Sequence, residues 1–79
     1  MKANVIITLK NGVLDPQGTA IASTLDHMGF AGASVRVGKF IELEVKESDA
    51  AKAKKAVEQM CEKLLANTVI EKYAIEMVA

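Results

Sequence analysis

In this chain, the run from Asn11 to Gly18 contains the residue types that most resemble a binding or catalytic site. It reads Asn-Gly-Val-Leu-Asp-Pro-Gln-Gly and joins an alternating apolar segment to a helical pattern. Free backbone N–H groups gather at a helix start and can bind anions, so the run predicts either an anion site or a tight structural turn. Asp15 is typical of a helix cap and Pro16 of the first helical position. One lysine and two isolated glycines make a weak phosphate signature, which favours the turn.

Gly18 falls inside the first turn of the predicted helix. Glycine there weakens a helix by about 0.5–1 kcal/mol relative to alanine, so packing or a partner must require a bare backbone at this position. Gly38 followed by Lys39 predicts a two-residue hairpin turn. Asn67 suits a left-handed backbone just after the second predicted helix.

The other reactive side chains do not form a recognisable catalytic set. Lys10, Arg36 and Lys39 make either a basic spot or ordinary solvated strand ends, and we favour the second interpretation. His27 lies at the edge of a predicted helix, with none of the Ser, Cys or carboxylate partners that catalysis by histidine requires. Glu42 and Glu44 share one strand face at a spacing that is ordinary for a solvated sheet.

Cysteine and histidine usage predicts no metal on this chain. Cys61 lies on an apolar helical stripe and is expected to be a small core residue. With one cysteine and one histidine in the sequence, neither an internal disulfide nor a zinc site of familiar spacing can form. No cofactor is expected on this chain either.

Length and composition predict a small domain that associates with other chains. The 79 residues, 51% of them hydrophobic, are treated as a single domain spanning residues 1–79, and a core of that size is marginal on its own. Ten basic and ten acidic residues argue against a nucleic-acid partner, which usually selects a basic excess. No apolar run approaches the ~18 residues of a membrane span, and the chain enters a strand pattern without a secretory signal. A cytoplasmic protein is expected.

The elements that would position these residues follow the order βαββαβ. Helical and alternating periodicities predict strands over 4–10, 33–37, 39–46 and 70–78 and helices over 16–28 and 49–66, the second capped by Ser48. This order predicts an α+β, ferredoxin-like fold, with a four-stranded antiparallel sheet and two helices on one face.

The uncovered sheet face would then be partly apolar, and we expect it to take part in association. Its predicted residues are Ile6, Thr8, Arg36, Phe40, Glu42, Ala74 and Val78. Other proteins with this fold can be compared at the same positions. The first loop lacks the Cys-x-x-Cys of a copper carrier and the arginine of an acylphosphatase, and Phe40 alone does not make the stacking platform of an RNA-recognition motif. An ACT-like module that senses small molecules remains an alternative.

Three motifs resemble one family. Gly12–Gly18, Val35-Arg36-Val37-Gly38-Lys39 and Cys61–Asn67 occur in the order and spacing of the PurS family, the small subunit of phosphoribosylformylglycinamidine (FGAM) synthase. The resemblance covers essentially the whole chain. Thr68 departs from it, because a proline is expected after Ala66-Asn67.

The resemblance implies a required but non-catalytic subunit of a purine-biosynthesis enzyme. The holoenzyme would convert formylglycinamide ribonucleotide (FGAR), ATP and glutamine to FGAM, ADP, phosphate and glutamate. A glutaminase subunit, PurQ, would release ammonia, and a synthetase subunit, PurL, would bind ATP and magnesium. The small subunit would be a homodimer or a dimer of dimers that bridges the two. Within this scheme the expected partner-contact residues are Gln17, Arg36, Lys39, Phe40 and Ile6, and the expected structural residues are Gly12, Asp15, Pro16, Gly18, Gly38 and Asn67.

Overall fold

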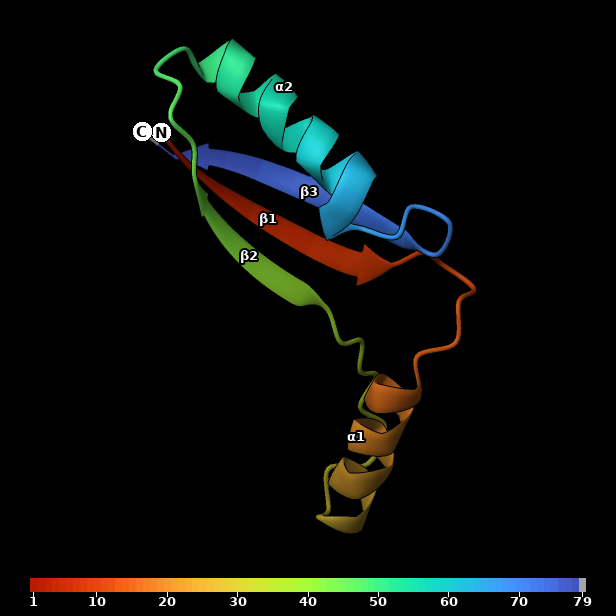
Figure 1. Cartoon of the computed structure of the whole chain (residues 1–79). Coiled ribbons are helices and arrows are strands. Elements are labelled where there is room, and N and C mark those ends of the chain that lie inside the picture. The colour runs from red at the N-terminus through yellow and green to blue at the C-terminus, as the bar shows by residue number, and fades with distance from the viewer. Residues whose placement is uncertain (79) are drawn as a thin grey trace.

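The computed structural model describes residues 1–78 and contains three strands and two α-helices (Figure 1). Their order along the chain is β1 (Lys2–Leu9), α1 (Pro16–His27), β2 (Lys39–Glu44), α2 (Ala50–Met60), a π-helical turn η1 (Cys61–Leu65) and β3 (Glu71–Val78). β-Branched residues dominate the middle of β1, and alanine and lysine, both good helix formers, dominate α2.

The sheet is antiparallel, with the strand order β2-β1-β3. β1 lies in the centre, where Val5 pairs with Ile41 of β2 and with Ile75 of β3. Side chains alternate between the faces of a strand, so these three residues share one face. The neighbouring set, Ile6 with Phe40 and Ala74, occupies the other.

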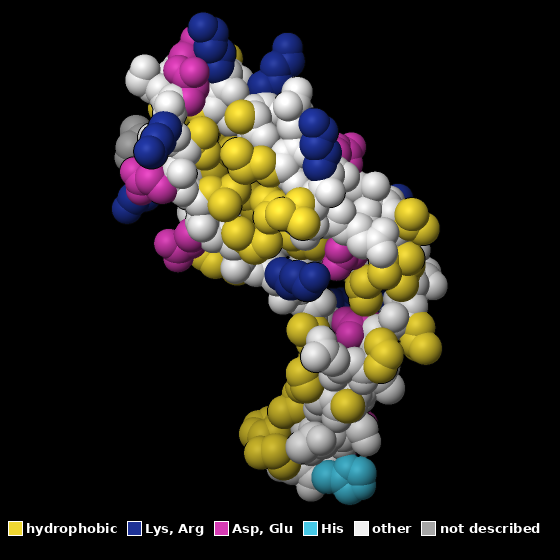
Figure 2. All heavy atoms as spheres, in the orientation of Figure 1, with side chains coloured by type: hydrophobic (Ala, Val, Ile, Leu, Met, Phe, Trp, Pro, Cys, Tyr) yellow, Lys and Arg dark blue, Asp and Glu magenta, His cyan; other side chains and the backbone are white. Residues whose placement is uncertain are grey.

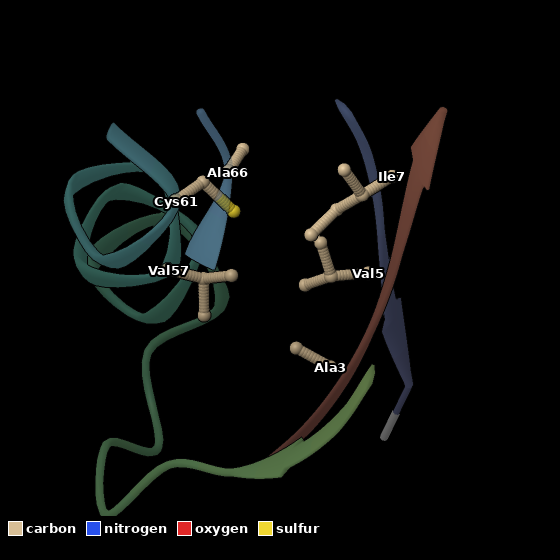
Figure 3. Packing of buried hydrophobic residues seen from close by; sticks show 6 residues of the cluster. All are labelled: Ala3, Val5, Ile7, Val57, Cys61 and Ala66. Carbon is tan, nitrogen blue, oxygen red and sulfur yellow. The ribbon is translucent and has the colours of Figure 1, made fainter. Parts of the chain in front are cut away.

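The core lies between α2 and β1 (Figure 3). Ala3, Val5 and Ile7 point from β1 toward Val57 on α2 and Cys61 at the start of η1, and all five side chains are fully buried or nearly so. Ile41, Leu43 and Val45 at the β2 side and Tyr73, Ile75 and Met77 on β3 are half-buried around this cluster. We call the three strands with α2 and η1 the body.

α1 lies outside the body (Figure 1). The chain leaves β1 at Leu9, forms α1 well beyond the end of the sheet, and returns along the helix through residues 30–37 to enter β2. We call residues 16–37 the arm and residues 30–37 its return segment. The radius of gyration is 15.9 Å, whereas a compact chain of this length has about 11–12 Å, so the molecule is extended.

This architecture corrects the predicted fold. The sheet has three strands instead of four, and one helix covers its face instead of two, because α1 packs on none of the strands extensively. The α+β class is as predicted, and the sheet is antiparallel as expected, with β1 at its centre and paired with the strand that begins at Lys39.

The missing strand and the missing hairpin have one cause. Residues 33–37 were predicted as a strand, but they belong to the return segment, where Val37 N–H donates to the Asp15 carboxylate instead of a neighbouring strand. The hairpin turn at Gly38-Lys39 is also wrong, because Lys39 already pairs with Ile7 as the first residue of β2. In residues 33–37, contacts with the Asp15 side chain and with α1 therefore replace the backbone pairing of a strand.

The second helix differs from its prediction at both ends. Asp49, not Ser48, caps α2, since its Oδ1 accepts the N–H groups of Ala51 and Lys52. The α-helix ends at Met60, and a π-helical turn continues it from Cys61 to Leu65. The left-handed backbone predicted at Asn67 is absent, because no residue but glycine has a positive φ among residues 1–78. No helix in this described part is long and apolar enough to cross a membrane.

Candidate partner interface

Asp15 joins α1 to the return segment at the base of the arm. Its side chain has two acceptor oxygens, and each is used: Oδ1 accepts Gly18 N–H at 2.9 Å and Oδ2 accepts Val37 N–H at 2.9 Å. Asp15 is buried, and Pro16 follows as the first helical residue. The Val37 and Gly18 N–H donors lower the pKa of the Asp15 carboxyl below its ordinary 3.8. The carboxylate therefore serves as a structural acceptor that joins the start of α1 to Val37.

Gly18 is the point at which the return segment presses on α1. A β-carbon there would collide with the backbone carbonyl of Val35 and would stand 2.9 Å from Asp15 Oδ2. This close approach explains why glycine occupies a helical turn that alanine would stabilise. The helix and the return segment therefore pack through bare backbone.

Arg36 ties the same region to the end of β1. Its guanidinium donates to the carbonyls of Val13 at 3.2 Å, Lys10 at 3.3 Å and Leu9 at 3.4 Å. Together with the bond from Asp15 to Val37, these contacts join the two connections between body and arm. We call these connections, residues 10–15 and 36–38, the hinge.

Two glycines meet separate needs at the hinge. Gly12 has φ +84°, which favours glycine because a β-carbon is strained there. At Gly38 a β-carbon would lie 2.7 Å from the Ile7 carbonyl oxygen, so the chain can pass this close to β1 only as glycine.

A cavity of about 300 Å³ opens between the hinge and the body. Its lining includes Asp15, Pro16, Gln17, Gly38 and Lys39, so the first two sequence motifs meet in space. Lys39 Nζ lies 3.7 Å from Glu71 Oε2 at its rim, and Gln17 is exposed beside it. The lining thus combines apolar walls with the Asp15 carboxylate, the Gln17 amide and one ion pair.

Ile6 and Phe40 lie together on the face of the sheet opposite α2. They are cross-strand partners, and Phe40 is 58% exposed. Arg36, which was predicted on the same face, lies instead in the hinge. This outer face is apolar at its centre and carries the exposed side chains of Glu42 and Glu44 along β2.

The remaining reactive groups are placed for structure. His27 Nδ1 donates to the Ser23 carbonyl at 2.8 Å one helical turn back. Burial raises the pKa of the buried Cys61 thiol, with the charges of Glu62 and Glu58 adding to the effect, and burial likewise raises the pKa of Tyr73. No group of three or more His, Cys, Asp or Glu residues able to hold a metal occurs within residues 1–78.

Sequence reasoning missed several exposed apolar side chains. Leu14 in the hinge is 78% exposed, and Leu64 and Val69 near the end of η1 are exposed to a similar degree. On a regular α-helix Leu64 would follow Cys61 on the same apolar stripe, but in the π-helical turn it is 82% exposed. Leu14 could have been noticed, because a bulky apolar residue in a predicted turn has no partner along the chain.

Comparison with known proteins agrees with the three motifs. The family model PurS, described as phosphoribosylformylglycinamidine (FGAM) synthase, matches residues 2–79. The PurS subunit of that synthase from Synechocystis is 49% identical over 95% of this chain and 76% of its own length. The Bacillus subtilis PurS subunit is 47% identical over 96% of this chain and 90% of its own length.

Solved structures show the same likeness in three dimensions. The B. subtilis PurS crystal structure superposes with a TM-score of 0.84 at 47% identity, covering 95% of this chain and 94% of that one. A chain of the Thermotoga maritima PurLQS structure superposes with a TM-score of 0.88 at 32% identity, covering 98% and 95%. Sequence and structure agree over nearly the whole length, and the chain belongs to the PurS family of FGAM synthase subunits.

Proposed function

We propose that this protein is the non-catalytic assembly subunit of an FGAM synthase, bridging a PurL-type synthetase and a PurQ-type glutaminase. The observation that carries the proposal is the superposition on a chain of the T. maritima PurLQS structure over nearly the full length of both chains. The enzyme would form FGAM, ADP, phosphate and glutamate from FGAR, ATP and glutamine in de novo purine biosynthesis.

The shape of the chain suits a bridging role. The molecule extends over 49 × 26 × 14 Å, and exposed apolar side chains occur at the hinge, along the arm, near η1 and on the outer sheet face. Such surfaces are typical of protein interfaces. An extended shape with several exposed apolar surfaces suits binding to two larger subunits. It is less suited to enclosing a substrate.

The chemistry of the reaction would reside on the other subunits. The synthetase would bind ATP and magnesium, and the glutaminase would release ammonia. The chain described here would orient the two so that ammonia passes between them without escape to solvent. We place this work in the cytoplasm, where ATP and glutamine are available.

Reconstitution tests the bridging role. The synthetase and glutaminase are purified separately and mixed with FGAR, ATP, magnesium and glutamine, with and without this protein. We expect glutamine-dependent FGAM formation and co-elution of all three chains only when it is present, while activity with added ammonia persists without it. Equal glutamine-dependent activity in its absence would overturn the proposal.

The same preparation separates bridging from small-molecule sensing. Isothermal titration of the isolated protein with amino acids and nucleotides should give no heat of binding. Tight binding of one of them without any partner would instead favour an ACT-like regulatory module.

A further inference from the structure

The two faces of the sheet differ in cover and in charge. On the face that carries α2, Figure 2 shows a continuous hydrophobic patch in the region where Figure 1 shows the strands beside the helix. The half-buried side chains of β2 on that face, Ile41 and Leu43, carry no charge. On the outer face no helix of the described chain packs against the strands. Apolar and acidic side chains lie next to each other there.

The strand register arranges the outer face in rows. Lys2, Asn4 and Ile6 of β1 each pair with one residue of β2 and one of β3. Neighbouring strands lie about 4.8 Å apart, and every second residue of a strand shares a face, so the paired side chains follow one another across the sheet. The apolar row consists of Phe40, Ile6 and Ala74, and the acidic row beside it consists of Glu42, Asn4 and Glu76.

The apolar row is open to solvent. Phe40 is 58% and Ile6 48% exposed, and Ala74 is exposed beside them. An aromatic ring and a branched aliphatic side chain on neighbouring strands give a contiguous apolar contact area, and aromatic residues are enriched where proteins meet. The row therefore has the composition of the centre of a protein contact.

The carboxylates of the acidic row have no cation within the described chain. Glu42 and Glu76 are exposed, and the ion pair that residues 1–78 contain joins Lys39 to Glu71 instead. The backbones of Glu42 and Glu76 are two strand spacings apart, about 10 Å, with Asn4 between them. A cation that approaches over Asn4 would therefore be attracted by both carboxylates.

The charge of the outer face determines which surface can cover it. Three glutamates and two lysines have their side chains there: Glu42, Glu44, Glu76, Lys2 and Lys72. A second copy related by a two-fold axis would bring the same excess of carboxylates against it, and nucleic acid or an anionic membrane would be repelled. A protein surface that presents a cation beside apolar side chains complements both rows.

Arginine fits this position better than lysine. Its planar guanidinium can pair with a carboxylate and also stack on an aromatic ring, whereas the lysine ammonium is a compact point charge. Phe40 and Glu42 follow each other on the outer face of β2, about 7 Å apart along the strand. One guanidinium can therefore contact the ring and the carboxylate together.

We propose that the outer face docks a basic and apolar surface of one of the larger synthase subunits, with an arginine stacked on Phe40 and paired with Glu42. Glu76 adds to the attraction, and apolar side chains beside the arginine cover Ile6 and Ala74. This inference rests on the proposed role in an FGAM synthase. It adds the face of this chain that makes the contact and the chemistry of the surface that meets it.

Charge reversal tests the sign of the partner. The native protein and its variants are titrated into purified synthetase and glutaminase, and glutamine-dependent FGAM formation gives the concentration for half-maximal assembly. The Glu42→Lys, Glu76→Lys variant should raise this concentration on the order of a hundredfold, because two attractive contacts become repulsive. Glu58→Lys, Glu62→Lys makes the same change of charge on the exposed side of α2 and η1, and this matched control should assemble like the native protein.

The outcomes separate the docking from the proposed function. A native protein that gives no glutamine-dependent activity would overturn the role in the synthase and the docking with it. Normal activity with the native protein and with the outer-face variant would overturn the docking alone, as would an equal loss in the control. All four glutamates are exposed, so both variants should keep the circular dichroism of the native protein.

The aromatic ring has a matched control of its own. Phe40→Leu keeps an apolar side chain but removes the ring, and it should weaken assembly about three- to tenfold. Phe30→Leu makes the same change at the tip of the arm, where Phe30 is 60% exposed, and should have no effect. Equal assembly by Phe40→Leu and the native protein would overturn the stacked arginine.

Photocrosslinking identifies what lies over the ring. With benzoylphenylalanine in place of Phe40, irradiation of the reconstituted complex should link this chain to a peptide of a larger subunit that carries arginine beside apolar residues. A link to an acidic peptide, or to a second copy of this chain, would overturn the proposal. Light scattering of the isolated Glu42→Lys, Glu76→Lys variant should give the native mass, and a lower mass would show that the outer face joins copies of this chain instead.

Discussion

The body and the arm use hydrophobic residues in opposite ways. In the body, Ile7 is 1% exposed and packs among other buried side chains between two layers. In the arm, Ile21 is 44% exposed and faces no other element of the described chain extensively. The arm is held instead by polar contacts at its base, from Asp15 and Arg36. Within one small chain, the body buries its own apolar side chains, whereas the arm leaves its apolar side chains exposed for contact with another surface.

Matched truncations should give the largest contrast between the two regions. Ile7→Ala leaves a cavity in the core between α2 and β1 and should cost about 2–5 kcal/mol of unfolding free energy, a large part of the stability of a small domain. Ile21→Ala should cost less than about 0.5 kcal/mol in the monomer, as an exposed substitution does. Urea denaturation at concentrations below dimerisation measures both. Equal losses would mean that α1 is packed in the monomer and would remove the distinction.

Two capping aspartates should give an intermediate effect. Asp15 uses both carboxylate oxygens on two backbone N–H groups, whereas Asp49 uses Oδ1 alone for both of its bonds. Asparagine has one acceptor oxygen, so Asp49→Asn should be nearly neutral while Asp15→Asn leaves one N–H at the hinge unpaired. Hydrogen exchange should become faster at the Val37 or Gly18 amide in Asp15→Asn and stay unchanged throughout the body.

Acid should loosen the arm before the body through the same residue. The pKa of Asp15 is lower in the folded protein than its ordinary value, because Val37 and Gly18 donate to the carboxylate. Its contribution to stability is therefore complete above about pH 4, and is lost as the pH falls through the lowered folded pKa. In the native protein, the hydrogen-exchange rate of the Val37 amide, divided by the intrinsic rate of an unprotected amide at the same pH, should rise as the pH falls through this range. The Asp15→Asn variant should show no such step.

The smallest effect is expected at the rim of the hinge cavity. The side chain of Lys39 is 64% exposed and that of Glu71 13%, and their charged groups stand 3.7 Å apart. Because water reaches the lysine end of the pair, we expect it to contribute about 1 kcal/mol or less. Lys39→Gln should therefore leave the urea midpoint almost unchanged. If Lys39 contacts a larger subunit, the same variant should weaken assembly of the three-subunit complex without changing the mass of the isolated protein. Normal assembly would remove Lys39 from the interface.

The sequence pattern predicted the buried faces of the body correctly, but it did not predict where the arm lies. The alternation of Val5 and Ile7 and the stripe through Ala53, Val57 and Cys61 indicate buried faces, and the structure buries all five. Periodicity reports which face of an element is apolar, not which surface covers it. For this reason α1 was recognised as a helix but placed on a sheet that it does not cover.

The strand predicted at residues 33–37 failed for a related reason. Val35 and Val37 have strand propensity, but the carboxylate of Asp15 and the bare backbone of Gly18 hold this segment along α1. Such contacts join residues about 20 positions apart in the sequence, and local patterns do not show them. The misplaced glycine at position 18 was the one clue in the sequence that another backbone approaches the helix.

The absence of a β-carbon at Gly18 also has a mechanical consequence. Because α1 and the return segment touch through bare backbone and are pinned together by Asp15, the arm should move as a stiff lever. Any force that a larger protein applies at its tip, near Phe30, would then act at the hinge, where the Arg36 guanidinium donates to the carbonyls of Leu9, Lys10 and Val13. A displacement of the arm would therefore shift the ends of β1 and β2. The distance between proteins bound at those strand ends would then depend on which protein holds the arm.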